Sequence, residues 1–294
     1  MPLSTPRENK RALLLVTPPI RGTFHNDNHD RLSLAFAKQG YDVHRQPHDK
    51  LCLTNGKPYI GEYPLDSFEL IWPVGFGPQR AYLDRLAIMN LADAGRFISP
   101  PQTVFSFHNK ARWLEFAPET HMSNDAATLA KIVQEGESEG GVWVLKPATG
   151  SFGRDVVKIT HATEVHERMA GVNSGYWLLQ HYVDDIALGE YRTLIACDQI
   201  IGTYLRKPKA GFHANLSEGA SASVAELPAN HSAIVKATHQ SLRAAQIGFA
   251  AIDTCGGYVL EVNVANPGGL GTLDDLYGGC SADRVVDSLL TRSL

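Results

Sequence analysis

Hydrophobic positions in the first third of the chain alternate between strand spacing and helix spacing. Residues 12–16 form a continuous apolar run, as a buried strand does, and residues 32, 35 and 36 then recur at helical spacing. Gly40 follows at the position where a helix commonly ends. Elements of the same kinds are expected at residues 41–44 and 68–74 (strands) and 83–94 (helix, ending at Gly95). This strand–helix–strand rhythm predicts a parallel α/β layer over residues 10–105.

The pattern changes after Ser99-Pro100-Pro101, where runs of strand length follow one another closely. Residues 191–196 and 200–205 are separated only by Cys197-Asp198-Gln199, which predicts an antiparallel pair. The other elements expected here are a short helix at 109–116, strands at 142–146 and 176–182, a helix at 234–245, and a hairpin of strands at 249–254 and 258–263. The fold class we expect is therefore α/β and α+β, in three lobes and not in one sheet.

Composition narrows the class of protein. A chain of 294 residues with 44% hydrophobic and 20% charged residues is globular and, at about 150 residues per domain, has room for two domains or more. A net charge of −4 gives no basic field for nucleic acid or an anionic membrane, and no apolar run is long enough to span one. The apolar run near the start is too short for a signal peptide. Four widely spaced cysteines predict reduced thiols and a cytoplasmic protein.

The hairpin sequence IDTCGGYVLEVN (residues 252–263) brings oxygen donors together. Glu261 and Asn263 share one face of a strand because side chains alternate. A three-residue loop, 255–257, would pair Asp253 with Val259 and so place its carboxylate on that face; a two-residue turn would point it away. We expect the three-residue loop, which makes a magnesium site of two carboxylates and an amide. The alternative is a surface strand with alternating polar residues.

Two further segments carry positive charge. In VWVLKPATGSFGRDV (142–156), Lys146 ends a strand and a loop of small residues follows, whose N–H groups suit phosphate oxygens; the alternative is an ordinary loop with a solvated lysine. In GEYRTLIACDQIIGTYLRKP (189–208), a hairpin would bring Arg192 and Arg206 together. Two neighbouring guanidinium groups need an anion between them, although each arginine having its own acidic partner is equally compatible with the sequence.

The order of these motifs resembles a known superfamily. Lys146-Pro-x-x-Gly, Gln180-x-Tyr-Val, Gly189-Glu-Tyr-Arg192, Arg206-x-Pro and Asp253…Glu261-Val-Asn263 follow one another as in the ATP-grasp proteins. Over nearly the whole chain, the sequence is similar to the prokaryotic glutathione synthetases. The resemblance implies an ATP-grasp fold with three parts: a substrate lobe over residues 1–107, a central lobe over 108–183, and a C-terminal lobe with the metal site over 184–294, with ATP between the last two.

The activity that the resemblance implies is ATP-dependent carboxylate–amine ligation. The γ-phosphate would pass to the carboxylate of γ-glutamylcysteine to give an acylphosphate, and the amine of glycine would then attack to give glutathione, ADP and phosphate. The implied cofactors are ATP and Mg²⁺, and the implied partners are small molecules, an acid and an amine. Relatives are commonly tetramers, so a homo-oligomer, either a dimer or a tetramer, is also expected.

The resemblance assigns a role to each candidate residue, and phosphoryl transfer explains these roles as positioning and charge neutralisation. The metal would be held by Asp253, Glu261 and Asn263. The phosphates would be held by Lys110 and Lys146 under a loop with Gly150, Ser151 and Gly153. The adenine and ribose would lie along Gln180, Tyr182, Val183 and Glu190. Arg192 and Arg206 would stabilise the acylphosphate. The substrates would contact Asn26, Asn215, Asn266, Gly268 and Gly269.

One segment departs from the family pattern and leaves the substrate open. The family has an arginine followed by Lys-Asp-Pro-Pro-Phe-Asp where this chain has residues 72–77, so a cationic contact to the dipeptide is missing or is replaced, for example by Arg80. The alternatives are therefore a ligase that joins a different acid and amine, or a non-catalytic nucleotide-binding protein. His25, His29 and His213 lack the neighbours of a metal site and are interpreted as solvated or packed side chains.

Overall fold

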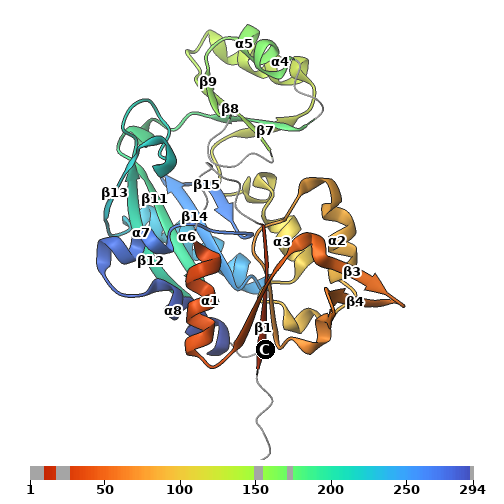
Figure 1. The fold of residues 1–294 in the computed structure, drawn as a ribbon. Coiled ribbons are helices and arrows are strands. Elements are labelled where there is room, and N and C mark those ends of the chain that lie inside the picture. The colour runs from red at the N-terminus through yellow and green to blue at the C-terminus, as the bar shows by residue number, and fades with distance from the viewer. Residues whose placement is uncertain (1–9, 18–26, 149–154, 171–174, 292–294) are drawn as a thin grey trace, which may run out of the picture.

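The N-terminal part of the chain is a three-stranded parallel sheet with helices around it (Figure 1). The computed structural model describes residues 10–17, 27–148, 155–170 and 175–291. The sheet has the order β2-β1-β6, which confirms the predicted parallel layer. Its elements are β1 (Arg11–Val16), β2 (Asp42–Pro47), β6 (Leu70–Pro73), α1 (Asn28–Lys38), α2 (Tyr82–Met89) and α3 (Pro101–Phe107). Alternate residues of β1 enter separate hydrophobic cores on the two faces of the sheet, so both faces are covered.

One expectation for this lobe is wrong, and one small sheet was not predicted. The helix predicted over 83–94 ends at Met89, and Leu83 and Leu91 of its apolar stripe are 68% and 57% exposed. The sequence analysis also missed a small antiparallel sheet formed by β3 (Leu51–Thr54), β4 (Lys57–Ile60) and β5 (Tyr63–Pro64). Its first turn is Asn55-Gly56, where both residues have positive φ (50° and 77°), a strong hairpin signal that was available in the sequence.

The central part of the chain forms a separate layer of one antiparallel sheet and two helices, at the top of Figure 1. The sheet has the order β7-β10-β8-β9. Its elements are β7 (Thr120–Ser123), α4 (Ala126–Glu137), β8 (Trp143–Pro147), β9 (Val157–Ile159), α5 (Ala162–Met169) and β10 (Trp177–His181). The helices and the sheet enclose a hydrophobic core of their own, built around Trp143, Trp177 and Leu129. The short helix predicted at 109–116 is only a 3₁₀ turn, Lys110–Trp113.

The C-terminal part is a five-stranded antiparallel sheet with the order β13-β12-β11-β14-β15. Its elements are β11 (Glu190–Ala196), β12 (Gln199–Lys207), β13 (Ser221–Val224), α6 (Ala229–Ala244), β14 (Phe249–Cys255), β15 (Tyr258–Asn263), α7 (Leu270–Tyr277) and α8 (Ser281–Thr291). The turn between β11 and β12 has two residues and not three, because Gln199 already pairs with Ala196. The remaining 3₁₀ turns are His48–Lys50, Leu65–Ser67, Gln79–Ala81, Ala94–Arg96, Asp184–Ala187 and Leu216–Glu218.

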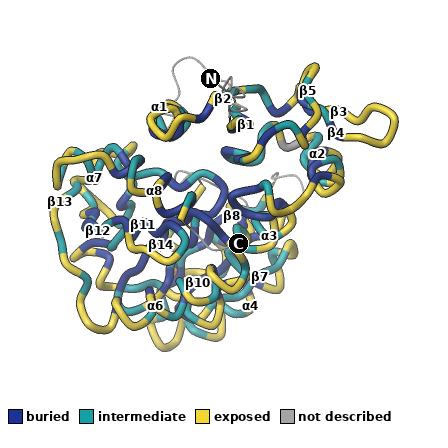
Figure 2. The backbone as a smooth tube through the Cα atoms, turned by 90° about the horizontal axis from the view of Figure 1, so that it is seen from below, coloured by how far each residue is buried: buried dark blue, intermediate teal, exposed yellow. Residues whose placement is uncertain are grey.

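The first and last lobes share a core, whereas the central lobe does not join it. Phe36 and Trp72 of the N-terminal lobe lie in one buried cluster with Phe249 and Leu289 of the C-terminal lobe, and the Trp72 and Phe249 rings meet edge to face at 5.6 Å. In Figure 2, buried residues (dark blue) gather around β11 and β14, the strand that carries Phe249. The lobe boundaries at residues 107 and 183 remain predictions. In the described part of the chain, no helix is both long and apolar enough to cross a membrane.

Candidate active site

The β14–β15 hairpin brings its two acidic side chains together by a different route from the predicted one. The turn is Gly256-Gly257, with both φ values positive (57° and 80°), so it is a two-residue turn and the predicted three-residue loop is wrong. Thr254 pairs with Val259, but the register then shifts and Asp253 pairs with Glu261. The extra residue of this β-bulge reverses the parity of the strand, so that Asp253 and Glu261 lie opposite each other.

Asp253 contacts both predicted arginines, although its strand, β14, is next to the strand of Arg192 only and is separated by β11 from the strand of Arg206. Arg192 pairs directly with Asp253 across β11 and β14 and donates to both carboxylate oxygens, at 2.8 and 2.6 Å. Arg206, from β12, lies 3.1 Å from the same carboxylate and also forms an ion pair with Glu190. The anion between the two guanidinium groups is therefore part of the protein itself, and the arginines share Asp253.

The arginines control the charge state of Asp253. Its burial would raise the pKa, but the Arg192 and Arg206 guanidinium groups outweigh this and lower the pKa of Asp253 to about 2. Asp253 is thus ionised at neutral pH, although it is almost completely inaccessible to solvent. A carboxylate that stays ionised in this way is able to serve as a ligand of a divalent cation.

The two predicted phosphate lysines reach this carboxylate pair from the central lobe. The Lys110 ammonium lies 3.0 Å from the Glu261 carboxylate. Burial would raise the pKa of Glu261, but Lys110 outweighs this effect and holds the pKa below its usual value. The Lys146 ammonium donates to the side-chain oxygen of Gln180 at 2.9 Å. These residues make up what we call the charged cluster: Lys110, Lys146, Glu190, Arg192, Arg206, Asp253 and Glu261.

Lys146 is the cation in this cluster whose charge depends on pH near neutrality. It is only 9% exposed, and burial, with some repulsion from Lys110, lowers the pKa of Lys146 to about 8. If Lys146 binds nucleotide phosphates as predicted, they favour its charged ammonium, and binding above pH 8 requires proton uptake. We expect the affinity for Mg–ADP to be about tenfold weaker at pH 9 than at pH 7, as measured by calorimetry.

The matched control for this pH effect is Lys146→Arg, because a guanidinium group keeps its charge over the whole range. Its affinity for Mg–ADP is expected to stay constant between pH 7 and pH 9. A wild-type affinity that is the same at both values would show that the charge of Lys146 does not take part in binding.

The predicted adenine edge follows β10 and the residues after it. The Gln180 side chain supports Lys146 and Thr120, a role that the backbone-based prediction missed. The Tyr182 N–H donates to the Val142 carbonyl at 2.9 Å, and the Lys158 ammonium lies 4.0 Å from the centre of its ring. The Val183 side chain is close to the turn at Gly256. Four other predicted residues, Asn26, Gly150, Ser151 and Gly153, lie outside the described residues.

The turn that follows β15, residues 264–269, carries three predicted substrate residues. The Gly268 carbonyl accepts from Arg192 at 3.3 Å, so this turn contacts the charged cluster. Gly269 has φ of +123°, and a Cβ atom there would lie 2.6 Å from the Tyr204 hydroxyl oxygen, so only glycine fits. Asn266 accepts from Asn28 at 2.9 Å.

Asn263 and Asn215 lie at the margins of the site. Asn263 is partly buried and pairs with Ala251, two positions along β15 from Glu261. The Asn215 carbonyl accepts from the Glu218 and Ala220 N–H groups and opens the turn Leu216–Glu218. Among the described residues, no group of three or more His, Cys, Asp or Glu side chains is arranged to hold a metal. Asp253, Glu261 and Asn263 remain the predicted Mg²⁺ ligands, since Mg²⁺ takes few protein oxygens and completes its shell with water and phosphate.

Sequence reasoning missed two neighbours of the site, one buried and one half-buried. Tyr204 is almost fully buried and pairs directly with Arg192 across β12 and β11. Strand alternation places Tyr204 on the same face as Arg206, so a signal for it existed. His108 lies near Lys110 and Glu261, and burial lowers its pKa, so it is neutral at pH 7. No pattern in the sequence pointed to His108.

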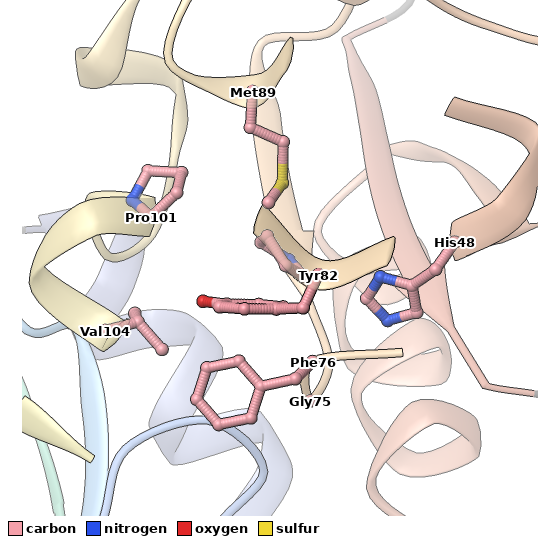
Figure 3. Close-up of a pocket in the computed structure, with 8 residues that line it drawn as sticks. His48, Gly75, Phe76, Tyr82, Met89, Pro101 and Val104 are labelled. Atoms are coloured by element: carbon pink, nitrogen blue, oxygen red, sulfur yellow. The ribbon is translucent and has the colours of Figure 1, made fainter. Parts of the chain in front are cut away.

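A small pocket in the N-terminal lobe adjoins the turn at 264–269 (Figure 3). It has room for about one water molecule. The Phe76 ring lies 4.7 Å from that of Tyr82 and 4.9 Å from that of His108. The Gly75 N–H donates to the Ala265 carbonyl at 2.9 Å, and this hydrogen bond joins the lining of the pocket to the turn at 264–269.

Arg80, the predicted replacement for the family's cationic contact, is not among the described residues that line this pocket. Arg80 is exposed in the turn Gln79–Ala81. Arg85 is buried instead and donates to the Phe76 and Pro78 carbonyls, so it supports the loop. Aromatic side chains therefore occupy the place where the sequence departs from the family pattern.

Comparison with known families identifies more than half of the chain. Residues 108–278 match the family model described as "Prokaryotic glutathione synthetase, ATP-grasp domain". Among curated proteins, the glutathione synthetase of Parasynechococcus marenigrum (strain WH8102) is 28% identical over 233 residues, which is 76% of each chain. The glutathione synthetase of Prochlorococcus marinus (strain MIT 9313) is 27% identical over 250 residues, 81% of this chain and 79% of that protein.

Solved structures show the same fold at low identity. The D-cycloserine synthetase DcsG superimposes with a TM-score of 0.68 at 17% identity, covering 95% of this chain and 98% of that one. The ATP-grasp ligase PsnB, solved with its minimal precursor, gives a TM-score of 0.70 at 12% identity, covering 97% of this chain and 100% of that one. The ATP-grasp fold therefore extends over the N-terminal lobe as well, outside the matched residues 108–278.

Proposed function

We propose that this protein activates a carboxylic acid as an acylphosphate. The premise is that the chain belongs to the family of prokaryotic glutathione synthetase ATP-grasp domains and is an ATP-dependent ligase that forms an amide bond. The observation that supports this most strongly is the charged cluster. Segments around residues 110, 146, 192, 206, 253 and 261 converge on one place, with cations and carboxylates nearly balanced. Phosphoryl transfer requires such an arrangement, because catalysis there is positioning and charge neutralisation.

The proposed role of each residue depends on the lobe to which it belongs. Lys110 and Lys146, from the central lobe, would hold the nucleotide phosphates as point charges. Asp253, Glu261 and Asn263 would hold Mg²⁺, which neutralises phosphate charge when it is bound. Arg192 and Arg206 lie on the other side of Asp253, where they would stabilise the charge that develops on the transferred phosphoryl group.

The two chemical steps follow from this arrangement. A carboxylate oxygen of the acid attacks the γ-phosphorus and ADP leaves, which gives the acylphosphate. The amine then attacks the acyl carbon, and the C–O bond breaks to release phosphate and leave an amide. The substrates that we propose are γ-glutamylcysteine and glycine, because the relatives with the family's domain are named glutathione synthetases. A homo-oligomer in the cytoplasm remains part of the proposal.

A second candidate is a ligase of the same chemistry that joins a different acid and amine. The observation that favours it is the aromatic wall of Phe76, Tyr82 and His108, beside a loop held by the buried Arg85. A dipeptide with several charges requires charged partners, whereas this wall offers rings and backbone groups.

The experiment that tests both candidates is ADP release from Mg–ATP with a panel of acids and amines. We expect ADP release to require an acid and to rise further with an amine, with γ-glutamylcysteine and glycine as the best pair. A better pair of another kind would favour the second candidate. Tight ATP binding without ADP release from any acid would contradict the ligase function and indicate a non-catalytic nucleotide-binding protein.

A further inference from the structure

Asn28 connects the N-terminal lobe to the turn beside the charged cluster. It is the first residue of α1 and is 1% exposed. Its side-chain amide nitrogen donates to the Asn266 side-chain oxygen at 2.9 Å and to the Pro267 carbonyl at 2.7 Å. A buried carboxamide that donates to two acceptors nearly 240 positions away in the chain fixes the position of that turn strongly.

The same turn is held at both ends. At its start, the Gly75 N–H donates to the Ala265 carbonyl at 2.9 Å. At its end, the Gly268 carbonyl accepts from Arg192 at 3.3 Å. The two hydrogen bonds donated by Asn28, to Asn266 and Pro267, lie between these two ends. The position of the Gly268 carbonyl, and with it one of the contacts that orient the Arg192 guanidinium group, therefore depends on the N-terminal lobe.

We infer that Asn28 is a positioning residue for phosphoryl transfer: by fixing the turn at 265–268, it holds Arg192 in line with Asp253. This inference rests on the proposed function, in which Arg192 stabilises the transferring phosphoryl group. Asn28 lies in the lobe that the acid substrate is expected to contact, so the same bond connects the acid side of the site to its arginines.

If the only role of Asn28 is to begin α1, the expected effect of Asn28→Asp is the opposite of the one that the positioning role predicts. At the start of a helix, an aspartate interacts better with the helix dipole than an asparagine does, so Asn28→Asp would preserve or increase stability if Asn28 only began α1. If Asn28 positions the turn, Asn28→Asp is harmful, because a carboxylate cannot donate and would face the Pro267 carbonyl oxygen. Asn28→Ala removes the same donors without adding charge.

The experiment compares Asn28→Ala and Asn28→Asp with Gln39→Ala. Gln39 follows α1 directly, and its carboxamide also donates to the C-terminal lobe, at 2.7 Å to Asp287, but far from the turn. We expect hydrogen–deuterium exchange of residues 264–270 in the ligand-free protein to be at least about tenfold faster in both Asn28 variants. We expect kcat to fall about 100-fold while the Kd of Mg–ADP changes less than about twofold. Gln39→Ala is expected to change neither.

Several outcomes would overturn the inference. Wild-type exchange and kcat in Asn28→Asp would assign Asn28 to the start of the helix alone. Equal losses in kcat and in Mg–ADP affinity would show general damage, and so would loss of the fold in both Asn28 variants when Gln39→Ala folds. If the wild-type protein releases no ADP with any acid, the proposed function fails, whereas the exchange measurement still tests the hold of Asn28 on the turn.

Discussion

Glu261→Gln is expected to lower turnover about a thousandfold, or about 4 kcal/mol, while the protein remains folded. Glutamine keeps the shape of the side chain but removes the negative charge that faces Asp253 and pairs with Lys110 at 3.0 Å. In the proposed site, that charge would hold Mg²⁺ and offset the two lysines. Glutamine is neutral and Glu261 is partly exposed, so the substitution does not bury a new charge.

The measurement is ADP release at saturating ATP, together with the Mg²⁺ dependence of ADP binding by calorimetry. Both the turnover and the Mg²⁺ dependence are expected to be lost. The matched control is Glu226→Gln, which makes the same change at an exposed position before α6 and is expected to have no effect. Wild-type turnover in Glu261→Gln would remove Glu261 from the site.

Arg192→Ala is expected to reduce turnover by about 100- to 1,000-fold, roughly 3–4 kcal/mol, through loss of transition-state charge stabilisation. Arg192 donates to both oxygens of Asp253 and to the Gly268 carbonyl, so its guanidinium group is held by three hydrogen bonds. A guanidinium group fixed in this way requires little reorganisation during the reaction, and this is why its contribution is expected to be large.

Stability must be measured with this variant, because Arg192→Ala also leaves Asp253 with Arg206 as its remaining cation. Arg192→Lys keeps a charge beside Asp253 and is expected to remain folded with most of the turnover lost, since lysine cannot form the bidentate contact. The surface control is Arg243→Ala, whose guanidinium group forms an exposed ion pair with Asp198. A loss of only a few tenths of a kcal/mol in Arg192→Ala would place Arg192 outside the reaction.

The sequence predicted the parts of the fold that depend on local patterns. The parallel strands of the first lobe and the antiparallel strands of the last were visible in hydrophobic spacing and turn length. The hairpin shows the limit of such reasoning. The loop length and the pairing of Asp253 with Val259 were predicted wrongly. The shared face of Asp253 and Glu261 was predicted correctly, because a bulge one residue long has the same effect on parity as a longer loop.

Contacts between distant segments could not be predicted from the sequence. Lys110 was assigned to the phosphates only through resemblance, and nothing in its own surroundings indicated that it would meet Glu261, about 150 positions later. The two arginines were expected near an anion, but that this anion is Asp253 depends on the strand order of the sheet. The contacts of Asn28 and His108 could not be predicted for the same reason, since each side chain contacts a residue of another lobe.

The most direct test of the account follows oxygen from the acid substrate. An acid labelled with ¹⁸O in its carboxylate is incubated with Mg–ATP and the amine, and the released phosphate is analysed by mass spectrometry. Activation as an acylphosphate transfers one carboxylate oxygen to phosphorus, so the account predicts one ¹⁸O atom in each phosphate, with ADP as the other product. Unlabelled phosphate, or AMP with pyrophosphate, would contradict it.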